Sequence, residues 1–73
     1  MPDVVCMDLP AARRAIRDVG AYFPRAFDAS GDGRVVIVEG NWIVVSQSPR
    51  AGGKVTQANA KLGVVKKDEP NPC

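Results

Sequence analysis

Hydrophobic positions near the start of the chain predict an amphipathic helix over residues 8–20. Apolar residues there recur at spacings of three and four, which is the period of a helix with one buried face. Asp8 suits the N-cap, Pro10 is tolerated in the first turn, and Gly20 suits a left-handed C-terminal cap. The apolar stripe comprises Leu9, Ala12, Ile16 and Val19, and the arginines that lie off it are Arg13, Arg14 and Arg17.

The pattern after Gly20 changes from helical spacing to short runs of β-branched and aromatic residues, which is typical of strands. Pro24 cannot donate to a strand ladder, so the first of these runs is expected at a sheet edge. A turn cluster, Ser30–Gly33, follows it. The runs are residues 21–28, an extended stretch at 34–38, residues 42–48 with the strongest strand signal, and residues 60–66.

The order helix, strand, loop, strand, turn, strand indicates an α+β fold. We expect one N-terminal helix packed on a small three-stranded, mostly antiparallel sheet. Residues 1–67 form the single predicted domain, and residues 68–73 form a C-terminal tail.

Composition narrows the classes of partner. The 73 residues suffice for one small domain with a thin core. The net charge of +2, from ten basic and eight acidic side chains, is too mild to indicate nucleic acid or an anionic membrane. No apolar run has the length of a membrane span, and the first residues, MPDVVCMDLP, lack the layout of a signal peptide.

Cys6 and Cys73 are the two cysteines, one near each end. A disulfide between them would tie the tail to the start of the domain, stabilise a small core and favour an oxidising compartment. The alternative is two unrelated free thiols. The chain has no histidine, and two distant cysteines lack the spacing of metal ligands, so no metal site or cofactor is expected.

Residues 28–39, DASGDGRVVIVE, match part of the calcium loop of an EF-hand. The matching positions are Asp28, Ser30, Asp32, Gly33 and Glu39. The EF-hand requires a helix on each side, whereas Pro24 precedes the loop and Gly40 begins a strand-like region after it. Turn chemistry is therefore the favoured interpretation. A weak calcium contact through Asp28 and Asp32 is the remote alternative.

The sequence offers no catalytic constellation, because no histidine stands beside a nucleophile and no phosphate-binding motif is present. We expect a protein that is not an enzyme. Two surfaces are candidates for binding. The residues of the polar surface could gather near one end of the sheet and bind carboxylates. The alternative is that they are ordinary surface charge. It comprises Arg25, Arg34, Asn41, Arg50 and Lys54.

The apolar candidate comes from strand alternation in residues 42–48. One helix covers only one sheet face, and Trp42 and Val44 are expected to face it. The other face would be a partner or dimer surface, unless the tail held by Cys73 covers it. Its residues are Phe23, Phe27, Ile43 and Val45.

The stretch QSPRAGGKV resembles the PASTA domain, the module associated with penicillin-binding proteins and Ser/Thr kinases. The PASTA pattern Gln-x-Pro-x-Ala-Gly-x-x-Val is matched here by Gln47, Pro49, Ala51, Gly52 and Val55, after Val44 in a valine-rich strand. The opening PDVV and the closing LGVVK agree with it, so the resemblance spans about residues 2–66. The usual glycine after PDVV is replaced by Cys6.

The resemblance implies a stand-alone variant of actinobacterial or mycobacteriophage type that binds peptidoglycan fragments or a cell-envelope protein outside the cell. The alternative is a structural or protein-interaction module without a small ligand, either a monomer or a weak homodimer. If Met1 is the native start, a cytoplasmic location is the alternative to the cell envelope. The Pro-Ala-Gly stretch itself is interpreted first as a structural turn.

Overall fold

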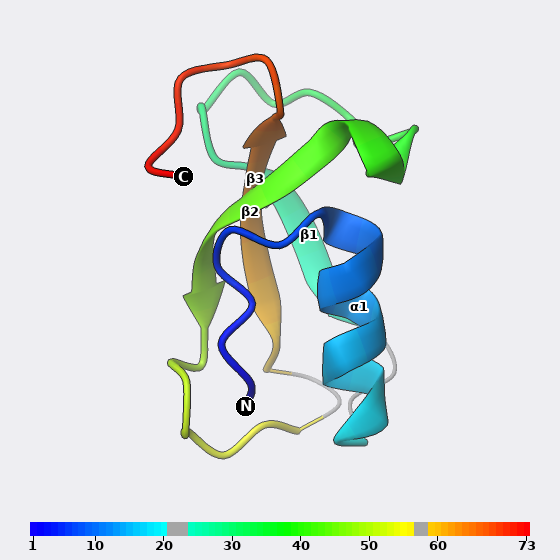
Figure 1. Cartoon of the computed structure of the whole chain (residues 1–73), viewed down its shortest axis with the longest axis vertical. Helices are drawn as coiled ribbons and strands as arrows, with labels where there is room; N and C mark the ends of the chain where they lie inside the picture. Colours follow the sequence, from blue (N-terminus) through cyan, green and yellow to red (C-terminus); the bar gives the residue numbers. More distant parts are fainter. Residues whose placement is uncertain (21–23, 57–58) are drawn as a thin grey trace.

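The computed structural model describes residues 1–20, 24–56 and 59–73. Its elements, in chain order, are α1 (Leu9–Asp18), β1 (Arg25–Asp28), a short 3₁₀ helix (Glu39–Asn41), β2 (Trp42–Ser48) and β3 (Lys61–Lys66) (Figure 1). The predicted helix and the strands at residues 42–48 and 60–66 are confirmed. Of the strand expected at 21–28, only its second half can be assessed, because residues 21–23 lie outside the described residues.

Local chemistry sets both ends of α1. The Asp8 side chain accepts a hydrogen bond from the Ala11 N–H at 2.8 Å, as an N-cap should, and Pro10 lies in the first turn. Gly20 has φ +98° and donates its N–H to the Arg17 carbonyl oxygen at 3.0 Å. A side chain at this φ would be strained, so glycine ends the helix where the sequence predicts.

The three strands form one sheet in the order β1-β3-β2, with β3 in the centre. β2 pairs with β3 antiparallel, whereas β1 pairs with β3 parallel. The α+β class with one helix and three strands is therefore confirmed, and the sheet is mixed. β1 is an edge strand, in agreement with the expectation from Pro24.

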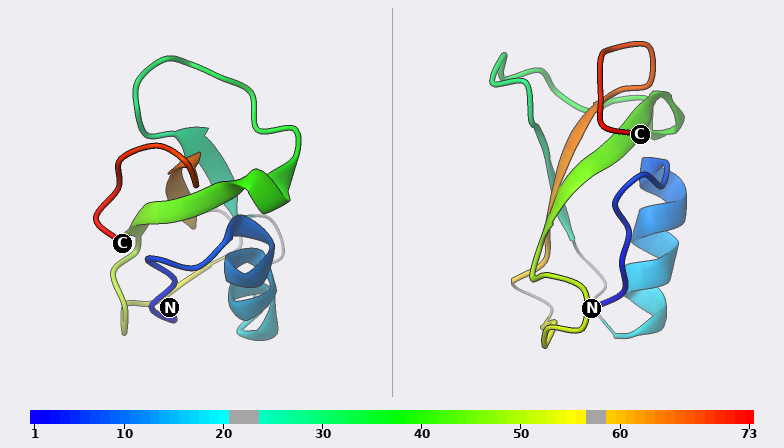
Figure 2. Two further views of the ribbon diagram at one scale, coloured as in Figure 1. Left: turned by 45° about the horizontal axis from the view of Figure 1, so that its top comes forward. Right: turned by 60° about the vertical axis from the view of Figure 1, so that its left-hand side comes forward.

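α1 covers one face of the sheet and leaves the other, the open face, without a helix (Figure 2). Trp42 and Val44 point to the helix side and are buried, as strand alternation predicts. The core that they join also contains Val4, Leu9, Ala12, Ile16, Ala60, Leu62 and Val64. Met1, Ala15, Ala26, Val36 and Val55 pack around its edge.

The N-terminal segment lies against the free edge of β2. The Cys6 N–H donates to the Val44 carbonyl at 2.8 Å, and the Val44 N–H donates to the Met7 carbonyl at 2.9 Å. An isolated bridge joins Asp8 to Ile43 in the antiparallel sense. This pairing fixes the entry to α1 relative to the sheet, and it brings Cys6 to the β2 side of the molecule.

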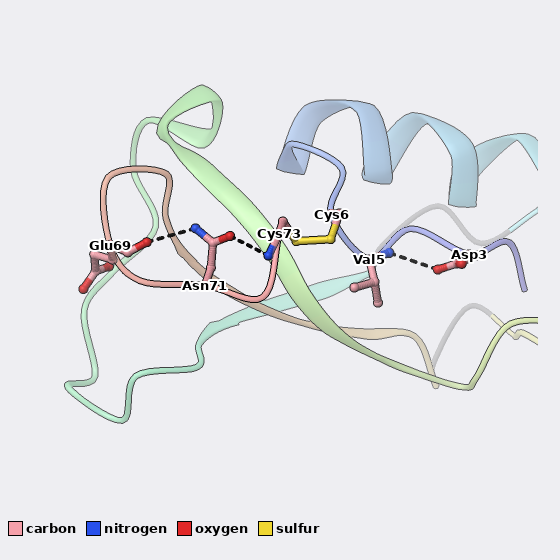
Figure 3. Close-up of a disulfide and its surroundings, with 6 residues drawn as sticks. All are labelled: Asp3, Val5, Cys6, Glu69, Asn71 and Cys73. Atoms are coloured by element: carbon pink, nitrogen blue, oxygen red, sulfur yellow. Dashed lines mark hydrogen bonds between the residues drawn. A yellow bond between two sulfur atoms is a disulfide. The ribbon is translucent and has the colours of Figure 1, made fainter.

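The predicted disulfide between Cys6 and Cys73 is present, with a Cα–Cα separation of 5.6 Å. The tail returns past the β2 side of the sheet to reach Cys6, and hydrogen bonds around Asn71 shape its course (Figure 3). The Asn71 side chain donates to the Glu69 carbonyl and accepts from the Cys73 N–H, each at 2.9 Å. The last residues are thus held both by the hydrogen bonds of Asn71 and by the Cys6–Cys73 disulfide.

Residues 34–38, which were expected to be extended, belong to no strand and do not join the sheet. Val36 packs against the core, whereas Val35, Ile37 and Val38 are 76%, 81% and 59% exposed. Within the described part of the chain, the N–H groups of residues 35–38 have no hydrogen-bond partner. No helix among the described residues is long and apolar enough to cross a membrane.

Candidate functional site

The five polar residues expected to gather near one end of the sheet are divided between its two ends. Arg25 pairs in register with Lys61, and Lys61 pairs with Ser48, so Arg25 lies at the end of the sheet from which loop 49–60 extends. Arg50 and Lys54 belong to that loop. Asn41 precedes Trp42, which pairs with Lys66 at the opposite end. Arg34 follows β1 and contacts the Trp42 ring, so it also lies at that opposite end.

Arg34 is bound within the protein by two carboxylates. Its guanidinium donates to Asp28 at 2.8 and 3.2 Å and to Glu69 at 2.6 Å, and it lies 5.0 Å from the centre of the Trp42 ring. These carboxylates raise the pKa of Arg34. Hydrogen bonds from Arg34 and then Ser30 hold the pKa of Asp28 far below its ordinary value. Arg34 therefore acts as a structural cation that links the loop after β1 to the C-terminal tail.

The same arrangement bears on the calcium loop. The Asp28 side chain is only 1% exposed, and it accepts hydrogen bonds from Ser30 and Arg34. Its lone pairs are thus used by groups of the protein. The loop is preceded by β1 and followed by the three-residue 3₁₀ helix and β2, not by the two helices of an EF-hand. Among the described residues, no group of three or more His, Cys, Asp or Glu side chains has an arrangement that could hold a metal ion.

Asn41 lines a surface hollow of about 320 Å³ at the same end as Arg34. Lys66, Lys67 and Asp68 complete its lining. Lys67 also approaches the Asp8 carboxylate at 4.0 Å, and the Lys66 ammonium lies 5.9 Å from the centre of the Trp42 ring. The hollow therefore mixes both signs of charge.

The open face carries a different arrangement, centred on Gly63. The Phe27 ring lies over this glycine, since a Cβ added at Gly63 would be 3.1 Å from Phe27 Cζ. That Cβ would also collide with the Ser46 hydroxyl oxygen. Phe27 remains 50% exposed, so one side of its ring is available to a ligand. Glycine at this position allows an aromatic ring and a hydroxyl to approach the strand together.

Two cations lie on the same sheet face, in the cross-strand row next to this ring. Arg25 and Phe27 are two residues apart on β1, and their register partners Lys61 and Gly63 are two residues apart on β3. Because alternate residues of a strand share a face, Arg25 and Lys61 also belong to the open face. Both are exposed. We refer to this arrangement as the open-face site; it comprises Arg25, Phe27, Ser46, Lys61 and Gly63.

The apolar surface expected on the open face is formed only in part. Phe27 is half exposed, whereas Ile43 and Val45 are half-buried. Phe23 lies outside the described residues. The tail reaches Cys6 on the β2 side of the sheet, and Phe27 on β1 is half exposed with the tail in place.

Residues 47–55, which begin within β2, have a structural role. The Gln47 side chain accepts a hydrogen bond from the Val4 N–H at 2.8 Å and donates to the carbonyls of Pro2 and Pro49 at 3.0 and 3.1 Å. The Gly52 N–H donates to the Met1 carbonyl at 2.8 Å. The stretch thus fixes the N-terminal segment against β2, in agreement with its interpretation as a structural turn.

Sequence reasoning missed Ser46, Lys61 and Gly63 as members of a site. A β-bulge between Val44 and Ser46 shifts the register, so that Ser46 pairs with Gly63 and Gln47 pairs with Leu62. The bulge is not visible in the sequence pattern. The available signal was Gly63 within an otherwise branched strand, since such a glycine often marks a close approach.

Comparison of the chain with protein-family models, with curated proteins and with solved structures finds no match.

Proposed function

We propose that this chain is a non-enzymatic extracellular module that binds anionic fragments of cell-wall peptidoglycan at the open-face site. The observation that carries the proposal is the half-exposed Phe27 ring, which lies on the open face next to the paired cations Arg25 and Lys61. An aromatic face suits the apolar side of a sugar ring, and a guanidinium suits the carboxylates of a stem peptide. The Ser46 hydroxyl adds a donor and acceptor beside them.

The resemblance to PASTA domains supports this class of ligand. Cys6 has φ +73°, a left-handed conformation that favours glycine, and PASTA domains usually have glycine at this position. The backbone here therefore agrees with the family pattern even though the side chain departs from it. The Cys6–Cys73 disulfide supports an oxidising, extracellular setting for the same reason that disulfides are rare in the cytosol.

A backbone-amide NMR titration with a soluble muropeptide tests the proposal. We expect saturable shifts at Phe27, Ser46 and Gly63, and a loss of affinity of about tenfold or more in Phe27→Ala. Arg25→Gln/Lys61→Gln should also weaken binding. Lys66→Gln/Lys67→Gln is the matched control, because it removes the same charge from the other end of the sheet.

An absence of amide shifts at millimolar muropeptide would rule out the proposal. Equal losses of affinity in the two double variants would do so as well, because they would indicate an effect of overall charge. Retained affinity in Phe27→Ala would exclude the ring as the platform.

A protein-interaction module is the second candidate, and the exposed apolar residues of segment 34–38 favour it. Val35, Ile37 and Val38 are largely exposed, and the N–H groups of residues 35–38 have no partner in the described part of the chain. A segment with exposed apolar side chains and unpaired N–H groups can pair with a strand from another protein or from a second copy. Analytical ultracentrifugation of the wild type and of Ile37→Ser would detect self-association, and identical monomeric profiles would exclude the homodimer.

A further inference from the structure

Charge is distributed unevenly between the two ends of the long axis. The end that includes loop 49–60, the first residues of β1 and β3 and the last turn of α1 is the basic end (Figure 1). Its cations are Arg17, Arg25, Arg50, Lys54 and Lys61, and its acidic residues are Asp3 and Asp18. The modest net charge of the whole chain therefore conceals a local excess of positive charge.

Ion pairing accentuates this difference. The ion pairs of Arg34 with Asp28 and Glu69 and of Lys67 with Asp8 lie at the opposite end. The pair of Arg13 with Glu39 lies between the two ends, since Arg13 also donates to the Pro24 carbonyl at 2.6 Å. None of the five cations of the basic end takes part in an ion pair within the described part of the chain. All five are exposed. Their full charge is consequently available to an external anion.

These observations point to a partner with several negative charges in a row. Exposed cations of one sign raise the local concentration of an anion and release its counterions on binding. Three of the five cations are arginines, whose planar guanidinium groups bind carboxylates or phosphates through two parallel hydrogen bonds. The cations come from α1, β1, β3 and loop 49–60, so a single small anion could not engage all of them.

We propose that the basic end docks a linear anionic glycan, a polymer with a negative group on successive repeats. The inference goes beyond the binding of a fragment at the open-face site, with which it shares Arg25 and Lys61. An anionic glycan is favoured over a nucleic acid because the Cys6–Cys73 disulfide belongs to oxidising compartments, where glycans are the common linear polyanions.

Binding of oligogalacturonate, measured by titration over a series of NaCl concentrations, tests this inference. Arg50→Gln/Lys54→Gln removes two charges from loop 49–60 without altering the open-face site. We expect it to reduce the slope of log K against log salt by about 1.4, since each contact with a single-stranded polyanion contributes about 0.7. Lys66→Gln/Lys67→Gln, with the same change of net charge at the other end, should keep the wild-type slope.

A neutral maltooligosaccharide of the same length should not bind. Equal slopes in the two double variants would overturn the inference, and so would tighter binding of an oligothymidylate of matched charge. Amide spectra of each variant establish that the fold is retained. If muropeptide binding fails and oligogalacturonate binding survives, the proposed function alone is lost; the reverse result removes only the docking of a polymer.

Discussion

At the residue scale, Gly63 determines how closely the elements of the open-face site approach one another. A methyl group there would collide with the Ser46 hydroxyl and would press on the Phe27 ring. The position is therefore glycine because of space, whereas Gly20 is glycine because of its φ. The distinction matters because a lack of space affects the ligand surface as well as the backbone.

We expect Gly63→Ala to reduce the free energy of unfolding by about 1–3 kcal/mol, the usual effect of inserting a methyl group into a packed position. Urea denaturation measures this change. Gly40→Ala is the control, because an added Cβ at Gly40 meets no atom within 4 Å. It should change stability by no more than about 0.5 kcal/mol. Equal midpoints for the two variants would mean that Ser46 and Phe27 move aside freely.

At the element scale, Arg34 joins the end of β1, the following loop and the tail. Glu69 accepts from Arg34 at 2.6 Å and from the Lys66 N–H at 2.9 Å, and these contacts lower the pKa of Glu69. The pKa of Asp28 is lowered as well, mainly by the hydrogen bond from Arg34 and next by the hydrogen bond from Ser30. The network holds the tail where the disulfide can form.

Acid should loosen this network. Both carboxyl groups have a lower pKa in the folded state than the value of about 4 expected in an unfolded chain. Their contribution to stability is complete above that value and is lost as pH falls through the folded-state pKa. We expect the Tm of the wild type to decline below about pH 4. At neutral pH the Tm of Asp28→Asn should be lower than that of the wild type, and it should decline less as the pH falls.

Asp32→Asn is the control for this measurement, because it removes a carboxylate from the same loop that makes no ion pair in the described structure. Parallel Tm profiles for the wild type and Asp28→Asn would show that the Arg34 network does not govern acid stability.

Local elements were predictable from the sequence, and their pairing was not. The Asp8 cap, the apolar stripe and Gly20 define α1, and the β-branched run from Trp42 defines β2, because these signals act over a few residues. The parallel pairing of β1 with β3 joins segments far apart in the chain, and the bulge after Val44 depends on packing. These two features place Lys61, Gly63 and Ser46 beside Phe27, so the site was visible only in part.

At the scale of the whole molecule, the disulfide closes a loop over a sequence separation of 67 residues. Closing so long a loop restricts the unfolded chain and, in the chain-entropy model, stabilises the fold by about 4 kcal/mol. We expect Cys6→Ser/Cys73→Ser to lose stability of this order, as measured by thermal or urea unfolding. An unchanged midpoint would mean that the unfolded chain gains little freedom.

Cys6→Gly/Cys73→Ser separates the two properties of Cys6, its disulfide and its left-handed backbone conformation. It also lacks the disulfide, but glycine relieves the positive φ at residue 6. It should be about 1 kcal/mol more stable than Cys6→Ser/Cys73→Ser. Equal stabilities would indicate that residue 6 leaves the left-handed region once the covalent link is removed.

The separation of charge between the two ends also makes the molecule an electric dipole along its 30 Å axis. In the field of an anionic surface, such a dipole experiences a torque that turns the basic end toward the surface before contact. Segment 34–38 lies at the opposite end and would then point outward, with its exposed valines and isoleucine directed away from that surface. Orientation alone would thus allow one small domain to meet an anionic surface with one end and leave the apolar side chains of segment 34–38 exposed at the other.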